Sequence, residues 1–286
     1  MIALQSILRK LVEQALEEDL GVGDLTTQAI FPHAFKARAV LQAKEDLILA
    51  GIEISAMVFE TLDPFLKFRP TAMDGKLIKA NSLIARLEGD GRSILMGERV
   101  AINFLQRLSA IATLTSKYVA AVKGFKARIV DTRKTTPGWR ILEKYAVRVG
   151  GGYNHRFNLG TGVLIKDNHV DLAGSLSKAV EKAKEFSPHP LKIEVEARTL
   201  QEVQEALSSG ADIILLDNMQ PGEIKTAVEN IKGRALVEAS GGITLSNVSE
   251  IAAAGVDYIS IGALTHSAPA VDICLNIEKK TRKGTA

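Results

Sequence analysis

Basic side chains are concentrated between Asp131 and His169, where seven Lys or Arg residues stand against three acids. The seven are Arg133, Lys134, Arg140, Lys144, Arg148, Arg156 and Lys166. Arg offers a two-pronged donor to carboxylate or phosphate, and Lys offers a compact point charge. This segment therefore predicts a binding site for a multiply charged anion.

The local sequence divides these basic residues into two groups. Four lie at expected strand ends or in glycine-flanked loops, namely Arg133, Lys134, Arg156 and Lys166. Three recur at helical spacing, namely Arg140, Lys144 and Arg148. Loop positions at strand ends favour a binding function, whereas we expect the helical group to form a solvated face. His155 stands beside Arg156, and both a structural and a binding role stay open for it.

Acidic residues follow in the next two expected strands. Glu194 and Glu196 alternate in Ile-Glu-Val-Glu-Ala, and Asp217 closes the run Leu-Leu-Asp. Alternation places Glu194 and Glu196 on one side of their strand, where an unpaired buried carboxylate would be costly. A cation must therefore face them. Buried Lys partners would serve, as would a magnesium ion carried by a phosphorylated substrate, which recruits one or two carboxylates.

Small-residue loops follow the last two expected strands of this region. They are Ala-Ser-Gly-Gly-Ile-Thr over 239–244 and Gly-Ala-Leu-Thr-His-Ser over 262–267. Each loop leads into a helix and presents backbone N–H groups that suit a phosphate. A basic end, an acidic middle and phosphate-binding loops together fit a phosphoribosyl donor placed beside an anionic acceptor.

The elements that must position these residues form a repeating pattern. Short apolar strands alternate with amphipathic helices from Ala127 onward, which predicts βα units around a parallel sheet, either a barrel or an open doubly wound sheet. The expected strands are Ala127–Asp131, Gly162–Ile165, Lys192–Glu196, Asp212–Leu216, Ala235–Ala239 and Tyr258–Ile261. In both architectures ligands bind at the carboxyl ends of the strands.

The first hundred residues predict a mixed α+β unit. Apolar spacing indicates helices over Leu4–Leu20, ended by Gly21, and over Ile52–Leu62. Expected strands are Ala37–Ala43, Leu47–Ala50, Lys76–Ile78 and Ser82–Leu87, the last followed by a Gly89-Asp90-Gly91 turn signal. A long helical pattern from Glu98 to Val122 is interpreted as the connection between domains.

Composition excludes several classes of protein. The 286 residues carry a formal charge of +3 and only 5% aromatics, which argues against a nucleic-acid-binding surface. The single cysteine, Cys274, has no internal disulfide partner and suits a reducing cytosol. No apolar run reaches the roughly 18 residues of a membrane span, and Arg9 and Lys10 argue against a signal peptide. We predict a cytoplasmic protein.

Five segments carry a resemblance to a known family, and they lie at residues 18–27, 98–106, 132–138, 150–156 and 164–169. They include Glu-Asp-Leu-Gly-Val-Gly-Asp-Leu-Thr-Thr, Thr-Arg-Lys-Thr-Thr-Pro-Gly and Leu-Ile-Lys-Asp-Asn-His. On these motifs the chain resembles the quinolinate phosphoribosyltransferases, the decarboxylating nicotinate-nucleotide pyrophosphorylases of NAD biosynthesis. Their reaction joins quinolinate to phosphoribosyl pyrophosphate and gives nicotinate mononucleotide, carbon dioxide and pyrophosphate.

The resemblance implies an α/β fold in three parts. An N-terminal α+β sandwich domain would span residues 1–112 with the start of the linking helix, and an incomplete parallel α/β barrel would span 113–268. A C-terminal segment over 269–286 would pack back on the N-terminal domain. The family also implies a homodimer in which one subunit's N-terminal domain covers the partner's barrel, with assembly beyond a dimer left open.

The resemblance also implies roles for individual residues. Quinolinate would be bound by Arg133, His155, Arg156 and Lys166, with Thr132 in the same loop and Arg99 from the other subunit. Lys134 would contact phosphoribosyl pyrophosphate, and Glu196 and Asp217 would contact its ribose hydroxyls. The same two acids would hold magnesium, partly through substrate and water. The 5′-phosphate would be held by Ser240, Gly241, Gly242, Ile261, Gly262, Ala263 and His266. The implied catalytic residues are Lys134, Lys166, Glu196 and Asp217, with no organic cofactor.

Two alternative functions stay open from the sequence. Lys166 at a barrel strand end would suit a Schiff-base aldolase if its amine were desolvated or depressed by neighbouring cations. A non-catalytic or molybdenum-operon paralogue would share the fold, and intact binding residues are the feature that argues against it.

Overall fold

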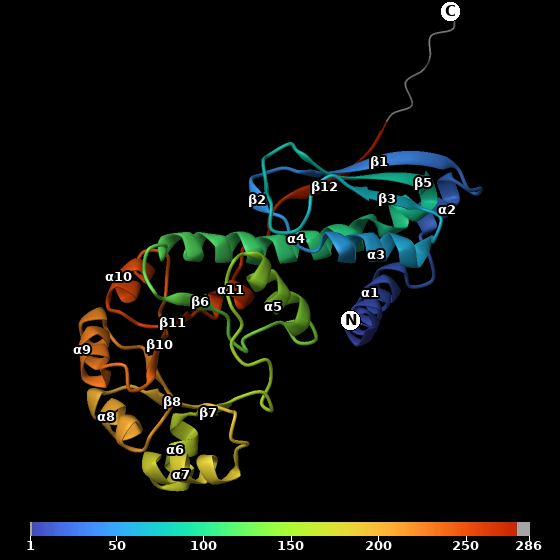
Figure 1. Cartoon of the computed structure of the whole chain (residues 1–286). Helices are drawn as coiled ribbons and strands as arrows, with labels where there is room; N and C mark the ends of the chain where they lie inside the picture. The colour runs from blue at the N-terminus through green and yellow to red at the C-terminus, as the bar shows by residue number, and fades with distance from the viewer. Residues whose placement is uncertain (1, 279–286) are drawn as a thin grey trace, which may run out of the picture. The chain divides into compact units, whose positions relative to one another are not determined.

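The computed structural model describes residues 2–278. Two compact units divide them, one formed by residues up to Thr113 together with those from Ala268, and the other by Leu114 to Ser267 (Figure 1). The C-terminal segment expected over 269–286 is described as far as residue 278, and residues 279–286 lie outside the described part. No helix within 2–278 is both long and apolar enough to cross a membrane.

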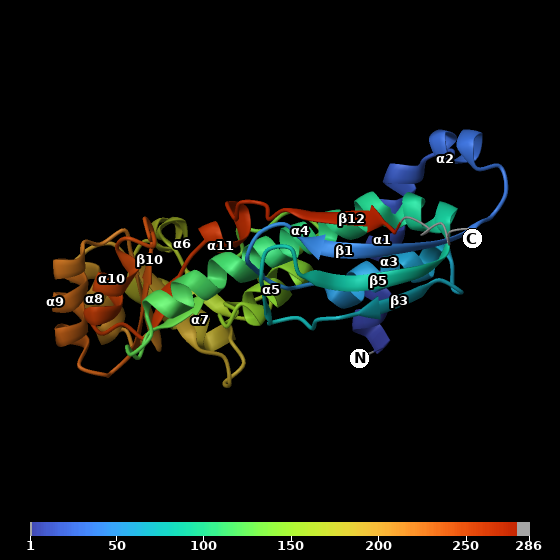
Figure 2. The ribbon, with the colours of Figure 1, turned by 90° about the horizontal axis from the view of Figure 1, so that it is seen from above.

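The first unit contains a four-stranded antiparallel sheet with strand order β12-β1-β5-β3, whose strands lie side by side in Figure 2. The strands are β1 (Lys36–Ala43), β3 (Lys67–Pro70), β5 (Leu83–Asp90) and β12 (Ile273–Ile277). Strand β12 pairs with β1 so that Leu41 faces Leu275. The last described residues therefore complete a sheet begun near residue 36.

Helices and a small ladder complete the first unit. They are α1 (Ile2–Leu20), α2 (Leu25–Ile30) and α3 (Ile52–Leu62), with β2 (Leu47–Ile48) paired to β4 (Leu77–Ile78). Helices α1 and α3 end where the sequence predicts, and α1 stops before Gly21, whose φ is 49°. Elements α2 and β3 were not predicted. Strand β3 is mostly exposed and ends at Pro70, so it lacks the apolar alternation of the other strands.

The long helix α4 (Gly91–Ala121) begins earlier than the predicted Glu98. The Gly89-Asp90-Gly91 signal marks a direct junction between strand and helix. Asp90 accepts a hydrogen bond from the backbone N–H of Arg92 at 3.0 Å, which satisfies an otherwise free donor of the first turn. A Cβ at Gly91 would lie 2.3 Å from the Phe35 ring, so only glycine fits at this junction.

The second unit is a six-stranded parallel sheet in the order β6-β11-β10-β9-β8-β7. Its strands are β6 (Arg128–Val130), β7 (Val163–Ile165), β8 (Ile193–Ala197), β9 (Ile213–Asp217), β10 (Leu236–Ser240) and β11 (Tyr258–Ser260). All six expected strands are present, and no strand end differs from its prediction by more than one residue. Strands β6 and β7 stand at the two edges, so the sheet is an incomplete barrel, as predicted.

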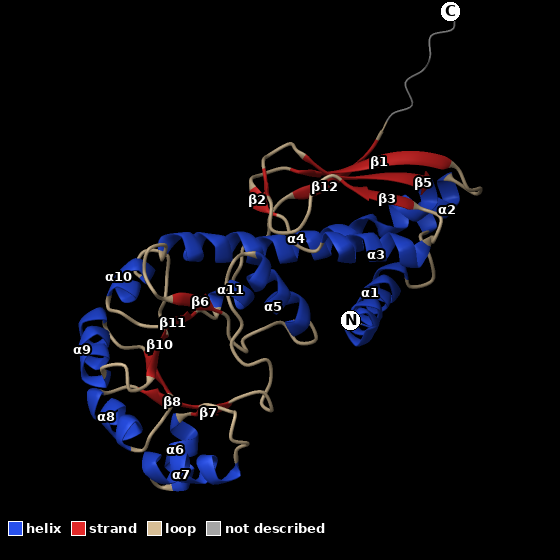
Figure 3. Ribbon diagram, viewed as in Figure 1, coloured by secondary structure: helices blue, strands red, loops and turns tan. Residues whose placement is uncertain are grey.

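Helices follow the strands of the second unit, namely α5 (Arg140–Val149), α6 (Asp167–Ala173), α7 (Leu176–Phe186), α8 (Leu200–Ser208), α9 (Pro221–Ile231), α10 (Val248–Ala253) and α11 (Ala263–His266). Figure 3 shows α8, α9 and α10 along the outer side of the curved sheet. Ile214, Leu215 and Leu216 on β9 are all buried, which is typical of a parallel strand covered on both faces. Glu196, Asp217 and Ser240 lie at or next to the carboxyl ends of β8, β9 and β10.

Candidate active site

A cavity of about 580 Å³ opens at the carboxyl ends of the strands of the second unit. Among its lining residues are Thr132, Arg133, Lys134, His155, Arg156, Lys166, Glu196, Asp217, Ser240, Gly241, Gly242, Ile261, Gly262, Ala263 and His266. The structure thus brings together every predicted site residue except Arg99. Arg99 is exposed on α4, in the part of that helix that belongs to the first unit.

The structure adds residues that the sequence did not single out. Glu238 and Ser260 line the cavity from β10 and β11. Arg198, which follows β8, lies within 3.5 Å of the lining residues Glu196 and Asp217. A signal for Glu238 was present, because it precedes Ser240 by two residues and so shares its side of the strand, as Glu194 does with Glu196. Charged residues around the cavity fall into two groups. The inner charge cluster comprises Asp131, Lys144, His155, Glu194 and Glu238, and the outer charge cluster comprises Lys166, Asp167, Glu196, Arg198 and Asp217.

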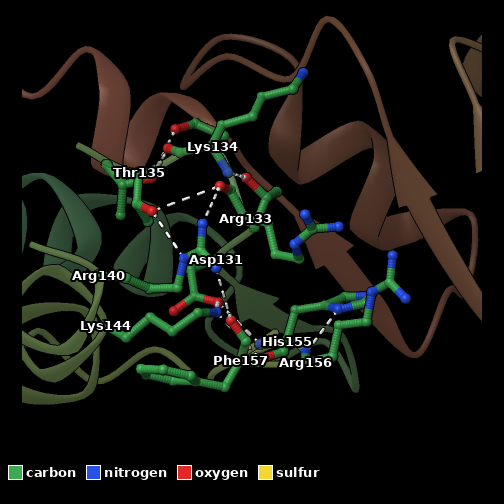
Figure 4. A network of polar contacts seen from close by, with 12 residues as sticks. Asp131, Arg133, Lys134, Thr135, Arg140, Lys144, His155, Arg156 and Phe157 are labelled. Carbon is green, nitrogen blue, oxygen red and sulfur yellow. Dashed lines mark hydrogen bonds and ion pairs between the residues drawn. The ribbon is translucent and has the colours of Figure 1, made fainter. Parts of the chain in front are cut away.

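A buried ion pair anchors the inner charge cluster. Lys144 on α5 pairs with Asp131 at the end of β6, and their side chains are 1% and 0% exposed (Figure 4). Lys144 also donates to the carbonyl oxygen of His155 at 3.1 Å, and Asp131 accepts the backbone N–H of His155 at 2.9 Å. Burial raises the pKa of Asp131 and lowers the pKa of Lys144, although each partner favours the other's charged form. The prediction of a solvated face was therefore wrong for Lys144.

Arg140 also departs from that prediction, because it ties two loops together. Its guanidinium donates to the Thr135 hydroxyl at 3.0 Å, to the Arg133 carbonyl at 3.3 Å and to the Phe157 carbonyl at 3.2 Å (Figure 4). Only Arg148 of the three is exposed, with its guanidinium 4.9 Å from the centre of the Tyr153 ring. The network fixes the backbone of the Arg133 loop and leaves the Arg133 side chain at the cavity.

His155 is the hydrogen-bonding partner of the buried acids, which was not among the partners expected from the sequence. Its Nε2 lies 3.1 Å from Glu194 Oε2 and 3.7 Å from Glu238 Oε1. Burial lowers the pKa of His155, but the hydrogen bond to Glu194 and the charges of both acids outweigh it and raise the pKa. Burial and the neighbouring Glu194 charge raise the pKa of Glu238 to about 7. The environment of this cluster therefore favours the protonated forms of both His155 and Glu238.

The outer charge cluster is partly open to solvent, because its cations are exposed while the side chains of Glu196 and Asp217 are only 9% and 18% exposed. Arg198 lies 2.8 Å from Asp167, 3.4 Å from Glu196 and 3.5 Å from Asp217, and Lys166 lies 3.4 Å from Glu196. The Lys166 side chain is 48% exposed and that of Arg198 is 52% exposed. Ion pairs whose cation is half exposed hold less net free energy than fully buried pairs, so a ligand can replace the cation. An exposed, ion-paired Lys166 also lacks the desolvation that a Schiff-base nucleophile requires.

Small residues shape the far end of the cavity. Gly241 has φ of +88°, and a Cβ there would lie 2.2 Å from the Asn218 side-chain oxygen. Gly242 also has positive φ, and its carbonyl accepts from the Asn247 side chain at 3.0 Å. A Cβ at Gly262 would lie 3.0 Å from the Lys134 side chain. The absence of side chains lets this main chain approach a bound group closely.

An incomplete α/β barrel with an anion-binding pocket at its strand ends defines the class of this protein. Within that class, profiles of the quinolinate phosphoribosyl transferase N-terminal and C-terminal domains match residues 24–109 and 111–276. The chain belongs to the quinolinate phosphoribosyl transferase family.

Relatives and solved structures agree with this family. A probable nicotinate-nucleotide pyrophosphorylase (carboxylating) from Synechocystis is 45% identical over 93% of this chain and 91% of its own length. A protein of the same description from Bacillus subtilis is 43% identical over 94% and 93%. The structure of the nicotinate-nucleotide pyrophosphorylase from Francisella tularensis superimposes with a TM-score of 0.91 at 39% identity, covering 96% of both chains.

Proposed function

We propose that this protein transfers the phosphoribosyl group of 5-phosphoribosyl 1-pyrophosphate to quinolinate in NAD biosynthesis. Decarboxylation accompanies the transfer, and the products are nicotinate mononucleotide, carbon dioxide and pyrophosphate. The observation that carries the proposal is the single cavity that joins the basic end, the two acids Glu196 and Asp217, and the small-residue loops. Relatives named for this reaction over nearly their whole length support it.

The basic end of the cavity suits the two carboxylates of quinolinate. Within residues 2–278 the buried Nε of Arg133 has no hydrogen-bond partner, so a donor is available to a ligand. Burial and the nearby Arg133 charge lower the pKa of Arg156, which indicates positive charge that an anion would relieve. We assign Arg133, Arg156 and Lys166 to carboxylate binding, with Thr132 in the same loop and His155 beside them.

The opposite end suits the phosphoribosyl donor. Ser240, Gly241 and Gly242, with the loop from Ile261 through Gly262 and Ala263 to His266, would surround the 5′-phosphate. Lys134 would contact the pyrophosphate. Glu196 and Asp217 would meet the ribose hydroxyls.

Magnesium fits the donor set at Glu196 and Asp217. Carboxylate oxygens are the ligands it prefers, and one or two of them suffice when a substrate phosphate supplies the rest. The Arg198 guanidinium lies within 3.5 Å of both acids, so this position already favours a cation. When bound, magnesium would neutralise charge on the departing pyrophosphate.

The residues of this chain account for the chemical steps without a covalent enzyme intermediate. Lys134 stabilises negative charge as the bond between ribose C1 and pyrophosphate breaks, while Glu196 and Asp217 favour positive charge on the ribose. The pyridine nitrogen then bonds to C1. The resulting cationic nitrogen draws in the electron pair of the bond to the 2-carboxylate, so carbon dioxide leaves and the ring carbon takes a proton.

A homodimer with shared active sites is part of the proposal. Arg99 is exposed on α4, and we assign it to the carboxylate-binding end of the partner's cavity. Mixing Arg99→Ala with Arg133→Ala protein tests this, because a hybrid dimer holds one pocket with both defects and one with neither. Up to about a quarter of wild-type activity should return if subunits exchange at random. Verified exchange without recovery would show that Arg99 serves its own chain. The cytoplasmic location stays a prediction.

One assay tests the proposed reaction. The protein is incubated with phosphoribosyl pyrophosphate, magnesium and either quinolinate or nicotinate, and nicotinate mononucleotide and carbon dioxide are measured. We expect quinolinate to be preferred by roughly a hundredfold or more, because a site built for two carboxylates leaves buried charge unpaired when one is missing. Comparable turnover of nicotinate would contradict the proposal, and no turnover of either would favour a non-catalytic paralogue.

A further inference from the structure

His155 has a protein partner at each of its polar atoms. Its backbone N–H donates to Asp131 at 2.9 Å, and its carbonyl accepts from Lys144 at 3.1 Å. In the ring, Nδ1 accepts the backbone N–H of Arg156 at 2.7 Å, and Nε2 faces Glu194 at 3.1 Å. Only one ring orientation satisfies both nitrogens at once.

Glu238 brings a second carboxylate to the same ring nitrogen, at 3.7 Å. Glu238 is 4% exposed, and the Ser260 hydroxyl donates a hydrogen bond to its carboxylate. Among the described residues, Oε1 of Glu238 and Oε1 of Glu194 are buried without a hydrogen-bond partner. Such atoms cost free energy, and an apolar side chain would fill this space at lower cost. Packing alone therefore does not account for an acid at position 238.

The position of Glu238 connects it to the basic end of the pocket. A second cavity of about 300 Å³ lies in the same unit, and His155, Arg156 and Glu238 line both cavities. These three residues thus form part of the wall between the two spaces. Glu238 therefore lies at the pocket wall next to His155 and Arg156, at the end of the pocket assigned to carboxylate binding.

Arg156 depends on His155 for its placement. Its backbone N–H is held by the His155 ring, and its Nη1 donates to the Gly162 carbonyl at 3.0 Å. If the ring turned away from Glu194 and Glu238, the backbone N–H of Arg156 would lose its acceptor. A chain of direct contacts therefore runs from Glu238 through His155 to Arg156 (the last link is drawn in Figure 4).

We propose that Glu238 is a positioning residue for anion recognition, fixing the His155 ring and, through it, Arg156 at the basic end of the pocket. The inference rests on the proposed function for the identity of the anion, quinolinate. Glu238 acts through His155 and does not itself bind the substrate. Its influence is therefore confined to the carboxylate-binding half of the cavity.

Ligand binding by Glu238→Gln protein tests this confinement. Gln keeps the shape of Glu and removes its charge, and Glu229→Gln on the exposed side of α9 is the matched control. Calorimetry should show quinolinate binding weakened about tenfold in Glu238→Gln, because a displaced Arg156 would lose about one charged hydrogen bond to a carboxylate of quinolinate. Phosphoribosyl pyrophosphate binding should change less than about twofold. Equal weakening of both ligands, or of neither, would overturn the proposal.

A second measurement needs no substrate. It tests the role of Glu238 even if wild-type protein fails to bind quinolinate, a result that would contradict the proposed function and not the positioning role. Hydrogen exchange of the Arg156 backbone amide should be about tenfold faster in Glu238→Gln than in wild-type or Glu229→Gln protein. An unchanged exchange rate would overturn the link through His155. If Glu238→Gln does not fold, Ser260→Ala keeps the charge and removes the hydroxyl that orients it, and should speed the same exchange about threefold.

Discussion

The inner and outer charge clusters differ in what completes them. In the inner charge cluster, Lys144 and Asp131 are almost fully buried and satisfy each other, and His155 is held at both ring nitrogens. In the outer charge cluster, Arg198 touches three carboxylates while half of its side chain stays in solvent. Buried pairs cannot be broken cheaply, whereas exposed pairs can be exchanged for ligand contacts. The inner charge cluster therefore builds the pocket, and the outer charge cluster is free to bind.

The largest effect should come from breaking the buried pair. Lys144→Met keeps the length of the side chain but leaves Asp131 buried without its partner, which should lower the free energy of unfolding by about 3–5 kcal/mol. Urea unfolding followed by the fluorescence of Trp139, the sole tryptophan, reports on the second unit. Adding Asp131→Asn should restore most of the loss. If the free energy of unfolding fell by less than about 1 kcal/mol in Lys144→Met, Lys144 would contribute no more to stability than an exposed lysine does.

A pH series should sharpen the contrast through Glu238, whose pKa is raised to about 7 from an ordinary value of 4.5. The folded state then binds this proton more tightly than the unfolded state. Its contribution to stability is fully present below pH 4.5 and is lost as pH rises to about 7, by up to about 3 kcal/mol. The difference in unfolding free energy between wild-type and Glu238→Gln protein should fall over this range. If the difference in unfolding free energy between the two proteins did not vary with pH, the raised pKa of Glu238 would be contradicted.

Substitutions in the outer charge cluster should weaken ligand binding and change the free energy of unfolding little. Glu196→Ala or Asp217→Ala should weaken phosphoribosyl pyrophosphate binding in the presence of magnesium by about a hundredfold, because an electrostatic contact to the donor is lost. Quinolinate binding should change less than about threefold, and unfolding by less than about 1 kcal/mol. Equilibrium binding of each ligand to each variant measures this. A loss confined to quinolinate would reverse the assignment of the two halves.

The smallest effect should come from an exposed lysine of the same unit. Lys126 lies 3.0 Å from Asp257, but its side chain is 57% exposed. Lys126→Met should therefore change the free energy of unfolding by less than about 1 kcal/mol, measured as for Lys144→Met. A loss near 3 kcal/mol would show that burial is not what separates the two lysines.

The sequence predicted the barrel strands and the pocket far better than the inner charge cluster. Aliphatic runs such as Ile213–Leu216 stop at an acid or a glycine, and both the strand and its carboxyl end can be read locally. Lys144 could not be read this way. Helical spacing indicates which residues share a face of α5, but Glu143 and Lys144 lie on the buried face beside Leu142. The partner that makes this possible, Asp131, reaches Lys144 only in the folded barrel.

Two strands in this protein pair with partners that are synthesised much later. Strand β6 pairs with β11, whose residues follow it by about 130 positions, and β1 pairs with β12 across 230 or more positions. During translation, β6 and β1 each keep an unpaired edge until β11 and β12, respectively, have left the ribosome. Long-range pairing of this kind slows folding and exposes strand edges to wrong partners. We expect nascent chains stalled before Tyr258 to bind chaperones that recognise such edges, and full-length chains to be released from them.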